Sequence, residues 1–136
     1  MDPGELTRRI HKATPFIALL GVEILTAGNG KAVLRLPLRD ELTQDLGYAH
    51  GGVVGAFADI AANTAWNLPS LTVEYKVNFL RGARGEQLYA RAELLKRGRT
   101  LSVAEARVYG QNESGEEVLA SIATVTLAPI KHPPSY

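Results

Sequence analysis

The chain has 136 residues, of which 46% are hydrophobic and 21% charged, and its formal net charge at pH 7 is +1. These values are typical of a single globular domain, and they give no reason to expect nucleic acid or an anionic membrane as a partner. Because cysteine is absent, disulfides, thiolate metal sites and a cysteine nucleophile are excluded. We find neither a membrane-spanning run nor a signal-peptide pattern, so we expect a cytoplasmic protein.

The first part of the chain predicts a short helix followed by a hairpin. Residues 4–13 carry apolar residues at helical spacing, and Pro15 interrupts that pattern. Residues 21–27 and 31–38 resemble strands, and the Gly-Asn-Gly sequence between them is a strong hairpin turn signal. The polar, glycine-containing residues 40–49 are expected to form a loop.

Residues 51–66 predict a four-turn helix that Pro69 ends. Its apolar residues occur on every side, which indicates a buried helix, and its many alanines let neighbouring backbone approach closely. A single carboxylate, Asp59, lies in this apolar segment. Its presence asks for an explanation, because an acid is rarely buried without a role.

The rest of the chain predicts four more strands. In residues 71–80, Val73, Tyr75, Val77 and Phe79 alternate with polar residues. The remaining strands are expected at 87–96, 100–109 and 117–127, and the proline-rich tail after them is expected to be mobile. This order predicts an α+β fold in which a six-stranded antiparallel sheet wraps around one central helix. The open sheet edges make pairing of two copies plausible.

His50 and Asp59 are too far apart on the helix to meet within one chain. Nine residues at 100° each turn through 900°, which places the two side chains on opposite sides, about 13.5 Å apart along the axis. If they form one site, that site takes His50 from one subunit and Asp59 from the other. Asn63 lies four residues after Asp59, on the same face, where it could steady a ligand or water.

Gly51 and Gly52 lie where the helix begins. The first amide N–H groups of a helix lack intrahelical acceptors and carry the positive end of its dipole. Such amides can hold a carbonyl oxygen that becomes anionic during acyl transfer, and glycine allows the close approach.

Each of these residues also has a structural interpretation. Asp59 could bond another strand or subunit, His50 could simply start the helix, and paired glycines often serve turn geometry. Gln44 has no meaning alone, and exposed arginines such as Arg81, Arg84, Arg97 and Arg99 usually face solvent. The residues taken singly leave these alternatives open.

Taken together, the residues resemble a known family. Gln44, His50-Gly51-Gly52 and Asp59, at their observed spacing, are similar to the signature of hotdog-fold acyl-CoA thioesterases, of the phenylacetate-degradation and 4-hydroxybenzoyl-CoA types. Residues 73–81 and 98–103 resemble later strands of that family, and the similarity extends over about residues 14–127. The signature combines features of two branches, so it does not identify the acyl group.

The resemblance implies a single hotdog thioesterase domain over residues 1–136, acting as a homodimer or a tetramer of paired dimers, with sites at the subunit boundary. The catalytic residues it implies are Asp59, His50, Gln44 and Gly51. Substrate contacts are expected from Gly52, Asn63, Phe79, Arg81 and Arg97. No metal or cofactor is expected, because coenzyme A is part of the substrate. Asp59 either activates water or attacks the acyl carbon itself.

The implied activity is hydrolysis of an aromatic or short-to-medium acyl-CoA to the free acid and coenzyme A. One alternative is a non-catalytic acyl-CoA-binding protein of the same fold. A hydratase or dehydratase of this fold is the third, although its histidine usually lies in a proline-containing stretch, unlike Tyr48-Ala49-His50.

Overall fold

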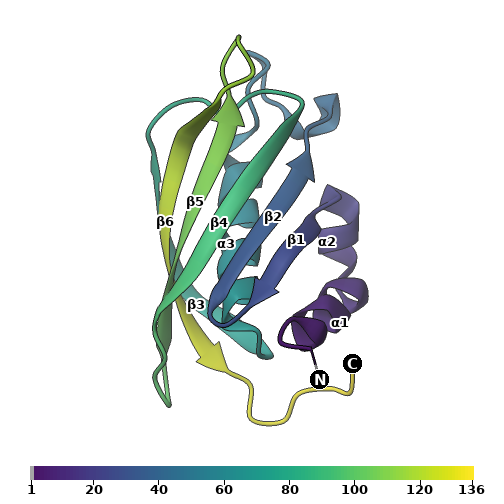
Figure 1. Ribbon diagram of the computed structural model, residues 1–136, viewed down its shortest axis with the longest axis vertical. Helices are drawn as coiled ribbons and strands as arrows, with labels where there is room; N and C mark the ends of the chain where they lie inside the picture. The colour runs from purple at the N-terminus through teal and green to yellow at the C-terminus, as the bar shows by residue number, and fades with distance from the viewer. Residues whose placement is uncertain (1) are drawn as a thin grey trace.

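A computed structural model describes residues 2–136 (Figure 1). Six antiparallel strands form one sheet in the order β1-β2-β4-β5-β6-β3, so β1 and β3 are its edges. The predicted α+β architecture is confirmed: the sheet curves around one long helix, α3. The strands are β1 (Glu23–Gly28), β2 (Lys31–Pro37), β3 (Ser70–Phe79), β4 (Gln87–Lys96), β5 (Ser102–Gln111) and β6 (Glu117–Pro129).

The central helix α3 spans Gly51–Trp66, as the sequence predicts. His50 caps its start, and Asn67 ends it in the left-handed conformation with φ of 60°. Most of the helix is buried against the concave face of the sheet. Small side chains on that face let the helix lie close, since larger ones would hold the backbones apart. These buried small residues are Ala90, Ala92, Ala104, Ala106 and Ala123.

The N-terminal segment forms two helices instead of the one predicted. α1 (Glu5–Ala13) is followed at once by α2 (Pro15–Leu20). Pro15 ends the first pattern but also starts the second helix, because proline's fixed φ suits the first helical position. Gly21, with φ of 85°, then ends α2. In Figure 1 both helices lie beside β1, at the edge of the sheet opposite β3.

β3 departs from the simple alternation that its sequence suggests. A bulge between Thr72 and Glu74 shifts the register against β6. Thr72 therefore faces α3, where it contacts Asp59, and Tyr75 faces α3 as well, where its ring lies 3.4 Å from the Cβ position of Gly55. The prediction that Thr72 and Tyr75 lie on opposite faces is wrong, because one extra residue in a strand reverses the side-chain parity.

The remaining elements agree with the prediction to within about two residues. The predicted Gly-Asn-Gly hairpin turn joins β1 to β2, with positive φ at Asn29 and Gly30. The 40–49 loop contains a short 3-10 helix, η1 (Asp40–Leu42), and an isolated bridge between Thr43 and Ala49. In the described part of the chain, no helix is long and apolar enough to cross a membrane.

Candidate active site

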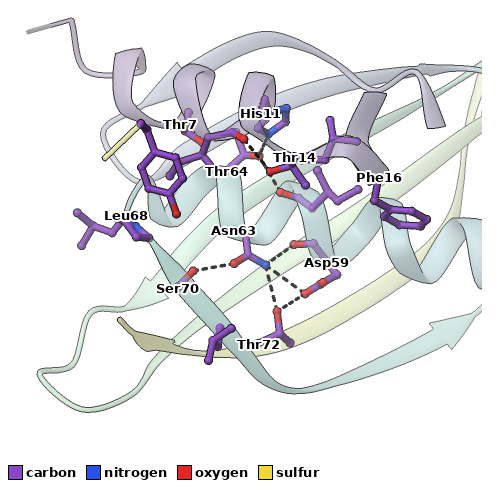
Figure 2. Close-up of a pocket in the computed structure, with 16 residues that line it drawn as sticks. Thr7, His11, Thr14, Phe16, Asp59, Asn63, Thr64, Leu68, Ser70 and Thr72 are labelled. Carbon is purple, nitrogen blue, oxygen red and sulfur yellow. Dashed lines mark hydrogen bonds between the residues drawn. The ribbon is translucent and has the colours of Figure 1, made fainter. Parts of the chain in front are cut away.

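Asp59 opens into a cavity of about 380 Å³ between α3, the two N-terminal helices and the start of β3. Figure 2 shows this cavity with α1 and α2 on one side and β3 on the other. Polar groups line it beside Asp59, among them Asn63 and Thr72. Its apolar lining consists of Ile10, Phe16, Ile17, Ile60, Leu68 and Leu71.

Hydrogen bonds hold the Asp59 carboxylate in place. Thr72 Oγ1 donates to Asp59 Oδ1 at 2.6 Å, and Asn63 Nδ2 donates to the same oxygen at 3.2 Å and to the Asp59 carbonyl oxygen at 2.8 Å. Ser70 Oγ donates to Asn63 Oδ1 at 2.7 Å, which fixes the orientation of the amide. Figure 2 shows this network joining α3 to β3.

The environment of Asp59 suits a base. Burial raises the pKa of the Asp59 carboxyl, and the hydrogen bonds from Thr72 and Asn63 oppose that shift. Asp59 Oδ2 accepts no hydrogen bond from any side chain or backbone N–H within residues 2–136, so this oxygen is open to water or substrate. The structural interpretation of Asp59 is therefore met by Oδ1, and Oδ2 is left for chemistry.

His50 caps α3 by accepting a hydrogen bond. Its Nδ1 accepts from the Gly52 N–H at 2.8 Å, so its structural role as a helix start is also real. In a neutral imidazole whose Nδ1 accepts, the proton is on Nε2. The exposed Nε2–H of His50 is thus a potential donor to a substrate carbonyl.

A second cavity, of about 360 Å³, lies at the start of α3. Gln44 and Gly51 line it together with Phe79 and Arg81. The Gly52 amide is already engaged by His50, which leaves the Gly51 N–H as the helix donor without an acceptor in residues 2–136. Gln44 Oε1 accepts from the Tyr48 N–H at 3.3 Å, so its amide NH2 group is the part that remains to bind a ligand.

The two cavities have no lining residue in common. One chain therefore does not bring Asp59 together with Gln44 and Gly51, in agreement with the helical geometry. Asn63 lies with Asp59, whereas Phe79 and Arg81 lie with Gly51.

Arg97 lies elsewhere in the molecule. Its guanidinium stacks 5.1 Å from the centre of the Trp66 ring, and Trp66 is the last residue of α3, at the end opposite Gly51. The structure does not group Arg97 with the other predicted substrate contacts of this chain.

The sequence reasoning missed Thr72, the strongest partner of Asp59. Its signal was hidden because the alternation in 71–80 predicted it on the other face, and nothing in the sequence marks the bulge. It also missed the contribution of the N-terminal helices to the Asp59 cavity, including His11 and Phe16.

Comparison with known proteins agrees with this architecture. The family model of the thioesterase superfamily matches residues 46–117. The crystal structure of a thioesterase family protein from Silicibacter pomeroyi is 39% identical and superposes with a TM-score of 0.87, covering 91% of this chain and 95% of that one. The phenylacetic acid degradation protein PaaI of Thermus thermophilus is 26% identical, with a TM-score of 0.74 over 86% of this chain and 98% of that one in one of its structures and 100% in another. A 1,4-dihydroxy-2-naphthoyl-CoA hydrolase of Listeria monocytogenes is 29% identical, over 80% of this chain and 90% of its own length.

A sheet wrapped around a central helix, with a carboxylate and a helix start exposed in separate cavities, defines a hotdog-fold hydrolase. The chain belongs to the thioesterase superfamily. The predicted hotdog fold and the predicted thioester hydrolase class are both confirmed. The individual site residues stay predictions.

Proposed function

We propose that the protein hydrolyses acyl-CoA thioesters carrying an aromatic or short-to-medium acyl group, at two equivalent sites formed between two copies of the chain. The observation that supports this most is the separation of Asp59 from the donors at the start of α3, which lie in two different cavities of one protomer. A complete site then needs both cavities, one from each copy.

The edge strand β3 supplies a surface for such pairing. Four of its apolar side chains are 47–67% exposed, namely Leu71, Val73, Tyr75 and Phe79. An exposed edge strand with apolar side chains is prone to pair with another strand. Antiparallel pairing with a second copy, about a twofold axis near Tyr75, continues the sheet across the dimer.

This pairing unites the two cavities. Thr72, near one end of β3, bonds Asp59, and Phe79, at the other end, lies 3.6 Å from the Cβ position of Gly51. Because the strands run antiparallel, the Thr72 end of one β3 meets the Phe79 end of the partner's. Asp59 of one protomer thereby faces Gly51 of the other.

The proposed reaction uses each group for one task. Gly51 N–H, with His50 Nε2–H and the Gln44 amide of the same protomer, polarises the thioester carbonyl, while the acyl group lies in the cavity beside Asp59. Asp59 takes a proton from water, the water oxygen bonds to the acyl carbon, and the C–S bond breaks to release the thiolate of coenzyme A, which is then protonated. In the alternative, Asp59 itself bonds to the acyl carbon and water hydrolyses the anhydride.

We expect this chemistry to need neither metal nor cofactor, since a thiolate is a good leaving group. Arg81, which is exposed beside the Gly51 cavity, is placed to contact the phosphates of coenzyme A. Incorporation of labelled oxygen from water in a single turnover distinguishes the two roles of Asp59: label in the carboxyl of Asp59 indicates nucleophilic attack.

The direct test is thiol release from a panel of aromatic and straight-chain acyl-CoAs. Asp59→Asn should lower kcat at least about 100-fold on the best substrate, because the variant has no base. Asp40→Asn, which changes an exposed acid in η1, is the matched control and should leave kcat unchanged. Equal rates for Asp59→Asn and wild type on the best substrate contradict the proposal.

A further inference from the structure

The register of β6 directs one buried hydroxyl toward the start of α3. Ser121 is paired with Phe79 of β3 and with Val108 of β5. Paired residues of antiparallel strands point to the same face of a sheet. Val108 is completely buried and the Phe79 ring contacts the Gly51 position, so Ser121 also faces the helix. Ser121 indeed lines the same cavity as Gln44 and Gly51.

The Ser121 hydroxyl has no partner within the protein. The residue is 1% exposed, and its Oγ makes no hydrogen bond within residues 2–136. Ser102 of β5 is the useful contrast, because it is 0% exposed but its Oγ accepts from the Gly98 N–H at 2.9 Å. A buried hydroxyl without a partner costs free energy, so its retention beside a cavity points to a ligand atom.

The cavity offers hydrogen-bond donors. They are the Gly51 N–H, the NH2 group of Gln44, whose oxygen is already used, and the O–H of Ser121. Three donors around one apolar-walled space suit an acceptor with two lone pairs, and a carbonyl oxygen is such an acceptor.

We propose that the Ser121 hydroxyl donates a hydrogen bond to a carbonyl oxygen of the acyl-CoA bound at the start of α3. This inference rests on the proposed function and adds a substrate contact that the sequence motif does not contain. Acyl-CoA has two kinds of carbonyl within reach of the reacting centre: the thioester carbonyl and the amide carbonyls of the pantetheine arm.

The test compares Ser121→Ala and the nearly isosteric Ser121→Cys with wild type, by kcat, KM and inhibition by free coenzyme A. Loss of one donor should lower kcat/KM about 10-fold in both variants. A fall in kcat with unchanged inhibition by coenzyme A indicates the thioester carbonyl, since that bond strengthens as the oxygen becomes anionic. A rise in KM together with weaker inhibition by coenzyme A indicates a pantetheine carbonyl.

Thermal unfolding without ligand separates this role from a structural one. Removing an unpartnered hydroxyl should leave the Tm of Ser121→Ala unchanged or raise it, whereas Ser102→Ala should lower Tm because it breaks an existing bond. The inference is overturned if kcat, KM and coenzyme A inhibition of both Ser121 variants stay within about twofold of wild type. If Asp59→Asn also retains full turnover, the proposed site itself has failed.

Discussion

At the scale of single residues, the balance of forces on Asp59 determines what this carboxylate can do. Burial raises its pKa, which strengthens it as a base, while the donors from Thr72 and Asn63 keep it ionised. Either influence alone would be less useful: burial alone would protonate the group, and hydrogen bonds alone would weaken its basicity.

This balance predicts the pH dependence of Thr72→Val. The Thr72 hydroxyl favours the charged carboxylate, so its removal raises the pKa of Asp59 further. The acid side of the kcat/KM profile should therefore move to higher pH, and activity should be lost earlier as pH falls. Thr72→Ser keeps the hydroxyl and should keep the wild-type profile. An acid side that does not move in Thr72→Val contradicts a catalytic role for the Asp59 carboxylate.

The sequence could identify Asp59, His50 and Gly51, because an isolated acid in an apolar helix and a His-Gly-Gly helix start are visible in one dimension. The hydroxyls that surround them are not visible in this way. Thr72 and Ser121 acquire their places from strand register, which depends on a bulge and on pairing between segments far apart in the chain.

At the scale of elements, the N-terminal helix α1 is attached to α3 by a buried histidine. Thr64 Oγ1 donates to the Ile60 carbonyl at 2.7 Å, so it accepts from His11 Nε2 at 2.8 Å. Burial lowers the pKa of His11 to about 4. Both residues line the Asp59 cavity, so this contact helps to form the wall of the proposed acyl site.

The His11 contact predicts an acid-sensitive loss of stability. Its pKa is about 4 in the folded chain and 6.5 in the unfolded chain, so between these values the unfolded state binds the proton more tightly. The contribution is complete above pH 6.5 and is lost as pH falls toward 4. It should reach about 2 kcal/mol, allowing for the partial exposure of the ring.

Denaturant unfolding of wild type and His11→Asn at pH 7, 5.5 and 4 measures this effect. The difference between the two proteins should shrink as pH falls, because only wild type has the titrating imidazole. Comparing the two also cancels the opposite trend from Asp59, whose raised pKa favours the folded state at low pH. A constant difference across this range contradicts the assignment.

The sequence predicts the elements well where periodicity is strong and poorly where two signals coincide. α3 and β4 have the predicted bounds, because their patterns are long and end at clear turns. α2 was missed because Pro15 reads as a stop signal, although the same ring geometry also starts a helix.

At the scale of the whole molecule, the account requires two chains. β3 presents apolar side chains at an open sheet edge, whereas the other edge, β1, lies beside the N-terminal helices. We therefore expect dimerisation through β3, and a further pairing of dimers into tetramers stays a prediction.

Val73→Lys tests this surface. Val73 is 55% exposed on β3, so a lysine there is tolerated in a single chain but opposes its own copy across a twofold axis. The dimer should dissociate more readily, with its Kd raised about 10-fold or more, and turnover should fall as the protein is diluted. Light scattering across a concentration series measures this effect. A wild-type protein that is monomeric at micromolar concentration contradicts the shared site.

Subunit complementation tests the central claim most directly. Asp59→Asn and Gly51→Val each disable one half of the proposed site, and valine at Gly51 meets only the exposed Phe79 ring, at 3.6 Å from its Cβ. After exchange of equal amounts, half of the dimers are mixed and each mixed dimer has one intact site. Mixing the two variants should therefore restore about one quarter of wild-type turnover. If both halves of the site came from one chain, the mixture would be no more active than the average of the two variants.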